Sequence, residues 1–161
     1  MKKIIIPVLF CLIAHIGFAQ KATNMSTIKV GPNGTIHYSQ MDNAPLFAGC
    51  ENAGTTKQQN KCTENKVQAY LQKSFDKNTA KSISAKRNIV DNNVYVRFIV
   101  NKQGAIENIG VRVSNEQMKA EIKRIVATLP RFSKGTHQGK AVNTSFSYWF
   151  QADLLLRNAA E

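Results

Sequence analysis

Alternation of apolar and polar residues in the C-terminal half constrains the fold of this chain more than any other feature. The alternating runs are residues 94–100, 106–113 and 142–151. Side chains that alternate with a period of two lie on opposite faces of a β-strand, so each run is predicted to be a strand with one buried face. The turn sequence Asn101-Lys102-Gln103-Gly104 predicts an antiparallel hairpin of the first two runs. The three-residue step from Ile106 to Ile109 predicts a bulge in the second strand.

A first helix is predicted ahead of the hairpin. Beginning near Thr63, Val67, Tyr70, Leu71 and Phe75 fall on one face, with charged and amide residues between them. The pattern predicts a helix of about 13 residues. Its apolar stripe is interpreted as a core face.

A second helix is predicted between the hairpin and the last strand. Its apolar stripe runs from Met118 to Leu129 at helical spacing. Ser114 and Gln117 have the spacing of a capping box at its start, and Pro130 ends it. We interpret this stripe as the face that covers the sheet.

A hairpin, a crossover helix and a returning strand form a split β-α-β unit. A right-handed crossover places the strand of residues 142–151 beside the strand of residues 94–100. The predicted fold class is therefore α+β, a three-stranded antiparallel sheet in the order second, first, third, with two helices on one face. The last strand then lies at a sheet edge, where its outer backbone groups have no partner.

The N-terminus has the composition of a secretory signal peptide. Lys2 and Lys3 precede an apolar run over residues 4–18, and Ala19 ends it. The run is shorter than the roughly 20 residues that a membrane-spanning helix needs. The sequence therefore predicts a signal peptide at residues 1–19 and export to the periplasm. The alternative is an uncleaved anchor, which would hold the chain at the inner membrane.

The rest of the chain divides into three segments. Residues 20–43 are a polar leader, in which Gly31-Pro32-Asn33-Gly34 between two short runs predicts a small hairpin. Residues 44–153 carry the predicted strands and helices and form one domain of ordinary size. Residues 154–161 are assigned to a C-terminal tail.

Two cysteines remain once residues 1–19 are removed, Cys50 and Cys62. An even pair in an exported protein predicts a disulfide. A metal site is disfavoured because there is no Cys-x-x-Cys sequence and His37 is the nearest histidine, whereas structural zinc prefers four protein ligands. We predict no metal and no other cofactor.

Charge and catalytic motifs narrow the function classes. The chain carries a net charge of +12, but its basic residues are spread over predicted helix and loop positions. This distribution favours a solvated basic surface over a nucleic-acid site, and in an exported chain the acidic partners are anionic lipid headgroups or acidic peptides. Neither a Gly-x-Ser-x-Gly elbow nor a His-Glu-x-x-His sequence is present. The sequence therefore does not predict an enzyme.

Four motifs are spaced along the chain: Ala44-Pro45-Leu46-Phe47-Ala48-Gly49-Cys50-Glu51, residues 94–100, Leu129-Pro130-Arg131-Phe132 and Gly139-Lys140-Ala141-Val142. Together they resemble the C-terminal domain of TonB, the energy transducer of Gram-negative envelopes. The resemblance covers about residues 44–152, and several spaced motifs are more specific than one. The chain departs from the family at Phe75-Asp76 and Asn92-Asn93, where such domains usually have Tyr-Pro and a glycine.

The resemblance implies peptide binding by strand addition. A TonB C-terminal domain holds the TonB box of an outer-membrane receptor as an added strand, and backbone bonds supply the affinity. The matching edge strand here consists of Val142, Asn143, Thr144, Ser145, Phe146, Ser147, Tyr148, Trp149, Phe150 and Gln151. The expected partners are TonB-dependent outer-membrane receptors, and no nucleic acid. If residues 1–19 are cleaved, nothing joins the domain to the inner-membrane motor.

A second hypothesis keeps the fold without the transport role. In it the chain is an envelope interaction or dimerisation module, and Tyr148 and Trp149 complete a core or the seam of a homodimer. The edge strand is compatible with both hypotheses.

Overall fold

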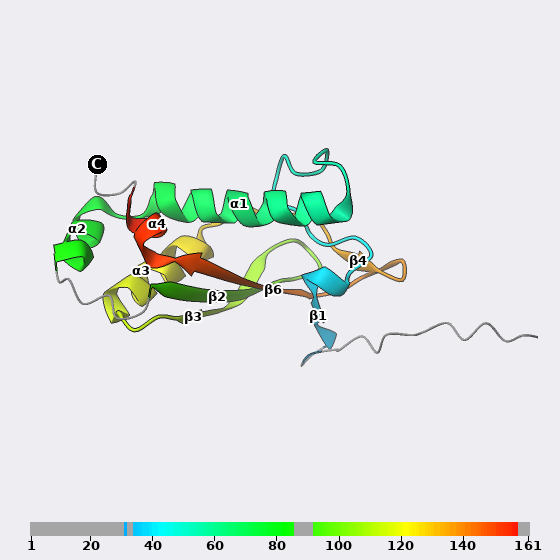
Figure 1. Ribbon diagram of the computed structural model, residues 1–161. Coiled ribbons are helices and arrows are strands. Elements are labelled where there is room, and N and C mark those ends of the chain that lie inside the picture. Colours follow the sequence, from blue (N-terminus) through cyan, green and yellow to red (C-terminus); the bar gives the residue numbers. More distant parts are fainter. Residues whose placement is uncertain (1–30, 32–33, 86–91, 158–161) are drawn as a thin grey trace, which may run out of the picture.

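The computed structural model describes residue 31, residues 34–85 and residues 92–157. Helices and a sheet are combined in one α+β fold, which confirms the predicted class, and α1 runs along one side of the sheet (Figure 1). The strands are β1 (Ile36–His37), β2 (Asn93–Val100), β3 (Ile106–Arg112), β4 (Thr136–His137), β5 (Lys140–Ala141) and β6 (Thr144–Gln151). The helices are η2 (Tyr38–Gln40, a 3-10 turn), α1 (Thr56–Ser74), α2 (Lys77–Ala85), α3 (Glu116–Ala127) and α4 (Ala152–Arg157).

The main sheet has four strands in the order β1-β6-β2-β3. β2 is antiparallel to both β3 and β6, so the three longer strands have the order expected from the right-handed crossover. β1 is parallel to β6 and makes the sheet mixed, so a three-stranded antiparallel sheet is not confirmed. The small hairpin predicted in the leader includes a strand at this place, but the sequence does not predict that this strand pairs with β6. β4 and β5 form a separate two-stranded sheet.

The hairpin of β2 and β3 contains an irregularity where the bulge is expected. Pairing shifts register between Arg97 and Ile99. Opposite this shift Asn108 adopts a φ of 52°. A residue in the left-handed region is characteristic of a bulged strand, so the predicted bulge is present.

Two helix starts differ from the expected positions. α1 begins at Thr56, seven residues before Thr63, where Thr55 and Gln58 form a reciprocal capping box. The first two turns of α1 carry no apolar residue, so no stripe marks them. α3 is capped by Asn115, whose side chain accepts a hydrogen bond from the Met118 amide at 2.9 Å, and the predicted capping role of Ser114 is wrong.

The core lies between the sheet and the helices. Alternate residues of β2 and β6 meet the apolar stripes of α1 and α3, and the rings of Phe98 and Phe146 stack at 5.4 Å. Fully buried side chains include Val67, Leu71, Val94, Val96, Phe98, Met118, Ile122 and Ile125. The other set of alternate residues therefore lies on a face of the sheet that these helices do not cover.

Segments outside the predicted domain also contribute to packing. Ile36 and Met41, in the predicted leader, are buried with Ala44. Leu155 and Leu156 of α4, in the stretch assigned to a tail, are buried against the main core. Of the small hairpin predicted in the leader, the described part is the Gly31 amide donating to the Thr35 carbonyl at 2.7 Å. The rest of that hairpin and the predicted signal peptide lie outside the described residues.

Cys50 and Cys62 form the predicted disulfide, which joins the loop before α1 to α1 itself. This bond is consistent with an oxidising compartment. Within residues 34–85 and 92–157, no helix combines the length and the apolar character that crossing a membrane requires.

Candidate functional site

The sequence-predicted binding residues Val142–Gln151 form β6 together with the two residues before it. Thr144, Phe146, Tyr148 and Phe150 are buried in the core. Ser145 and Ser147 are half-buried on the opposite face, and Trp149 and Gln151 are exposed there. Strand alternation therefore leaves only half of the β6 side chains accessible to a partner.

The inner side of β6 is fully paired. β2 runs antiparallel to it over eight residue pairs, from Asn93 with Gln151 to Val100 with Thr144. Only the outer side of β6 can therefore accept another strand.

β1 occupies the beginning of this outer side. The Ile36 amide donates a hydrogen bond of 3.0 Å to the Asn143 carbonyl, and His37 pairs with Ser145. Backbone groups of alternate strand residues point the same way, so those of Ser147, Trp149 and Gln151 also point outward. In the part of the chain that the structure describes, no strand pairs with this outer edge from Ser147 to Gln151.

Two aromatic side chains hold β1 in place. His37 Nε2 lies 3.0 Å from the Ser147 hydroxyl, and His37 Nδ1 lies 2.8 Å from the Ser39 hydroxyl. Burial and the nearby Arg97 guanidinium lower the pKa of His37, which favours the neutral imidazole. Tyr38 follows immediately, and its ring stacks on Phe146 at 5.0 Å. His37 thereby fixes this segment to the open side of β6, and Tyr38 fixes it to the core side.

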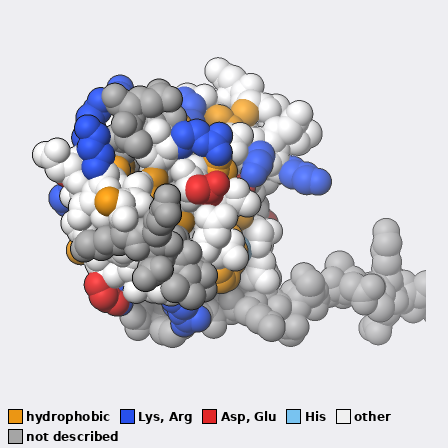
Figure 2. Space-filling view, turned by 60° about the vertical axis from the view of Figure 1, so that its left-hand side comes forward, with side chains coloured by type: hydrophobic (Ala, Val, Ile, Leu, Met, Phe, Trp, Pro, Cys, Tyr) orange, Lys and Arg blue, Asp and Glu red, His pale blue; other side chains and the backbone are white. Residues whose placement is uncertain are grey.

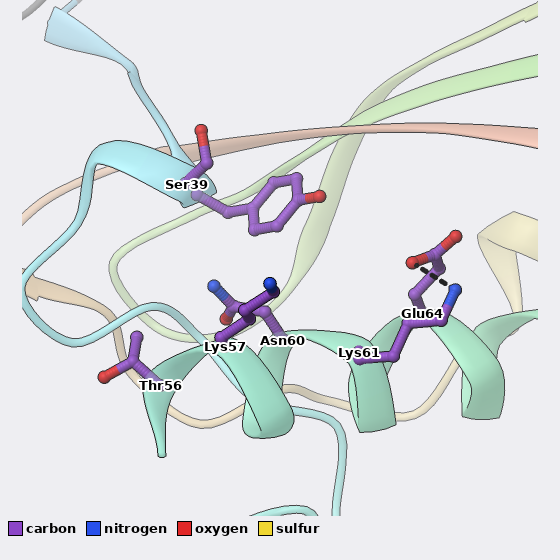
Figure 3. A pocket seen from close by; sticks show the side chains of 7 residues that line it. Ser39, Thr56, Lys57, Asn60, Lys61 and Glu64 are labelled. Carbon is purple, nitrogen blue, oxygen red and sulfur yellow. Dashed lines mark hydrogen bonds and ion pairs between the residues drawn. The ribbon is translucent and has the colours of Figure 1, made fainter.

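A hollow lies between η2 and α1 (Figure 3). It measures about 480 Å³ and is lined by Tyr38, Ser39, Thr56, Lys57, Asn60, Lys61 and Glu64. Lys61 and Glu64 pair along α1 at 3.1 Å, as the dashed line in Figure 3 marks. A solvated i,i+3 pair of this kind contributes little and is ordinary on a helix surface. Each lining residue has a polar or charged group, and neither histidine nor cysteine is among them.

Tyr148 carries a buried hydroxyl on the core side of β6. It has no hydrogen-bond partner among the described residues, and burial, with Tyr38 and Glu64 nearby, raises the pKa of the phenol well above its usual value. The hydroxyl therefore stays neutral. Tyr148 is therefore a core residue. Of the two aromatic residues predicted to complete a core or a homodimer seam, only Trp149 is available at the surface.

The face of the sheet that the helices do not cover, called the open face below, also brings together residues that no sequence motif marks. Tyr95 lies opposite Trp149 across the β2–β6 pair and opposite Arg112 across the β2–β3 pair. Arg97 lies between Ser147 and Gly110 in the same way. Alternation alone predicts that these side chains face outward, but only the register of three strands shows that they are neighbours.

One face of the molecule shows how its basic side chains are spread. Figure 2 shows Lys and Arg side chains at several separate places on the face in view, not in one continuous patch. Among the described residues, no three histidine, cysteine, aspartate or glutamate side chains are grouped so that they could hold a metal ion.

Comparisons with protein-family models, with curated proteins and with solved structures found no match for this chain.

Proposed function

We propose that this protein is a periplasmic adaptor of the TonB C-terminal type, which binds an extended segment of an outer-membrane receptor by strand addition to β6. The four spaced motifs named above support this reading, as does the position of β6 beside β2 at the end of the three longer strands. The disulfide is consistent with an oxidising compartment such as the periplasm.

The pairing of β1 with β6 carries the proposal. An extended segment already adds to the outer edge of β6, in parallel, through the Ile36 amide and the Asn143 carbonyl. This intramolecular pairing supports the proposal that the edge accepts an added strand. Beyond β1, the outward backbone groups of Ser147, Trp149 and Gln151 are the ones that an added peptide would use.

A receptor peptide would gain affinity from backbone hydrogen bonds and specificity from alternate side chains. Trp149 is 64% exposed and stands on the face that half of an added peptide's side chains would share. An apolar or aromatic peptide residue beside Trp149 would cover it. The receptor segment is therefore expected to be extended and to carry apolar residues at alternate positions.

Titration with synthetic TonB-box peptides tests this proposal. Trp149 is the single tryptophan of the chain and reports binding by its fluorescence. Ser147→Pro removes an outward amide without removing a bond to β2, a position at which edge strands tolerate proline. Ser147→Ala is the matched control, because it removes the same contact with His37 and keeps the amide.

We expect saturable binding by the natural protein and by Ser147→Ala, and at least roughly tenfold weaker binding by Ser147→Pro, because a lost backbone bond typically costs about 1 kcal/mol and the ring obstructs its neighbours. Circular dichroism must show that both variants are folded. Absence of saturable binding for every peptide, or equal binding by the two variants, would refute strand addition.

Dimerisation is the second candidate function, and the same free edge supports it. Unpaired edges of β6 in two copies can pair with each other around a two-fold axis. Light scattering of the purified protein distinguishes the two candidates. A dimer that Ser147→Pro converts to a monomer would favour the dimerisation module, whereas a monomer that binds peptide favours the adaptor.

A further inference from the structure

The face of the sheet opposite the helices carries an unusual set of side chains. Tyr95 and Arg97 of β2, Arg112 of β3 and Trp149 of β6 all project from it, as their alternation with buried residues requires. Trp149 is the one large hydrophobic side chain among the described residues that is mostly exposed. This face is distinct from the outer edge of β6, which offers backbone groups.

Two arginines flank a small hollow in this face. Gly110 lies directly opposite Arg97, and Arg112 follows two residues later, on the same side of β3. Because Gly110 has no side chain, the space between the two arginines is open, and the hollow measures about 150 Å³. Its lining residues are Tyr95, Arg97, Gly110, Val111 and Arg112.

Both guanidinium groups are available. The guanidinium groups of Arg97 and Arg112 make neither a hydrogen bond nor an ion pair with a described residue, whereas that of Arg124 is paired with Glu121. The acidic residue on this face of the described strands is Glu107, whose carboxylate accepts a hydrogen bond from the Asn101 side chain. Guanidinium groups match the geometry of phosphate oxygens and bind them through two parallel hydrogen bonds.

An aromatic pair adjoins the arginines. The rings of Tyr95 and Trp149 lie 4.8 Å apart, and Tyr95 also borders the hollow. Tyrosine and tryptophan have an apolar body and a polar tip, which suits them to the boundary between lipid headgroups and acyl chains. Aromatic rings and cations thus stand side by side on one surface.

We propose that this open face docks the protein onto an anionic phospholipid bilayer. Arg97 and Arg112 bind lipid phosphates, and Trp149 enters the headgroup region beside them.

The shape and chemistry of the face favour a bilayer over a peptide. β2 is paired on both sides, so the centre of this face offers side chains but no free backbone groups to an extended chain. A sheet face is broad and without a deep groove, which suits a planar partner. The net charge of +12 adds long-range attraction to an anionic surface.

The proposal does not depend on peptide binding. Strand addition uses outward backbone groups of β6 and is tested by Ser147→Pro, whereas docking uses side chains of β2 and β3 as well. Failure of one leaves the other standing. If both hold, a peptide that covers Trp149 competes with the bilayer for this side chain.

Vesicle binding tests the inference. The whole protein is mixed with vesicles of phosphatidylcholine alone or of phosphatidylcholine with phosphatidylglycerol, and binding is followed by sedimentation and by the emission of Trp149. We expect binding and a blue shift with the anionic vesicles only, and weakening by salt, because exposed charges are screened. Arg97→Gln with Arg112→Gln should weaken binding about thirtyfold, since each basic side chain near such a membrane contributes about fivefold.

The control removes two charges elsewhere. Lys123 and Lys134 are exposed, on α3 and in the loop after it, and α3 packs against the other face of the sheet. Lys123→Gln with Lys134→Gln should weaken binding severalfold at most. Trp149→Ser should abolish detectable sedimentation while circular dichroism remains unchanged.

Four results would overturn the inference. Three of them concern vesicles: equal binding to neutral and anionic vesicles, equal losses of binding in the two double variants, and binding without a blue shift of Trp149 emission. The fourth is binding of inorganic phosphate or of a single-stranded oligonucleotide by a protein that does not bind vesicles. The last would assign the arginines to a soluble phosphate ligand or to nucleic acid instead.

Discussion

Gly104 lies so close to Phe132 that a Cβ on its backbone would stand 2.1 Å from the Phe132 carbonyl oxygen. The Phe132 amide in turn donates a hydrogen bond of 3.0 Å to the Gly104 carbonyl. Gly104 also has a φ of +82°, a conformation that residues with a side chain rarely adopt. The turn of the β2–β3 hairpin is thereby held against the segment that follows α3.

We expect Gly104→Ala to be among the most damaging single-methyl changes in this protein. The left-handed backbone costs an alanine about 1–2 kcal/mol and the collision with backbone adds about 1–3 kcal/mol, so the free energy of unfolding should fall by about 2–5 kcal/mol. Urea denaturation followed by circular dichroism measures it.

Gly139→Ala is the matched control for this change. Gly139 has a φ of +71° but nothing within 4 Å of an added Cβ. It should lose only the backbone cost of about 1–2 kcal/mol. Equal losses in the two variants would show that the contact with Phe132 does not matter.

The Cys50–Cys62 disulfide is expected to stabilise the domain by about 3 kcal/mol, because it closes a short loop in the unfolded chain. Cys50→Ala with Cys62→Ala should lower the free energy of unfolding by this amount. Reduction with dithiothreitol should destabilise the natural protein equally and leave the double variant unaffected. A reductant effect of the same size on both proteins would contradict the prediction.

Glu121 joins three segments. Its Oε1 accepts hydrogen bonds from the Asp76 amide at 2.9 Å and from Arg124 at 2.6 Å, and Arg124 donates also to the Ser74 carbonyl. The hydrogen bond from Arg124, against the opposing effect of burial, lowers the pKa of Glu121 below 4.5. This stabilisation is therefore present above the unfolded pKa and is lost as the pH falls through the folded pKa.

Glu121→Gln should accordingly lower stability near neutral pH by roughly 1–2 kcal/mol, and less in acid, where the natural carboxyl is also uncharged. Denaturation curves at several pH values measure the difference. Glu116→Gln, which breaks an exposed pair with Lys119, should cost less than about 1 kcal/mol. A loss from Glu121→Gln that does not change with pH would rule out an ionic role.

His37 makes the pairing of β1 sensitive to pH. Burial, and secondarily Arg97, lowers its pKa from 6.5 in the folded protein, so the unfolded chain binds the proton more tightly. The contribution of neutral His37 to the free energy of unfolding is complete above pH 6.5. It declines as the pH falls from 6.5 towards the pKa of His37 in the folded protein. Protection of the Ile36 amide from hydrogen exchange should fall over this range, after correction for intrinsic rates.

His37→Gln serves as the control, because it retains hydrogen-bonding groups without titrating. Its Ile36 amide should show no such change in protection across the same pH range. A pH dependence as large as that of the natural protein would assign the effect to another group.

The long elements follow from local sequence patterns. β2, β6 and α3 have periodic apolar residues that identify both the element and its buried face, as Val94 to Val100 illustrates. The polar beginning of α1 at Thr56 and the two residues of β1 carry no such periodicity. α4 is also missed, because three consecutive leucines in a short run indicate burial without indicating helix or strand.

The candidate surfaces are only partly visible in the sequence. The position of β6 beside β2, at the end of the three longer strands, follows from the crossover rule, since it needs only strand order. The pairing of β1 with the outer side of β6 does not follow from that rule, because it is a long-range pairing of Ile36 with Thr144. The grouping of Tyr95 and Arg112 depends likewise on register, which a bulge shifts.

Because β1 belongs to the same chain, it competes with any strand that is added to the outer side of β6. β1 continues directly into η2, whose Tyr38 stacks on Phe146. A segment tethered this closely competes at an effective concentration that is of the order of millimolar for short connections. A peptide that pairs along all of Val142–Gln151 must displace it, whereas a peptide confined to Ser147–Gln151 need not. The length of the added strand, and not only its composition, therefore determines the apparent affinity of this edge.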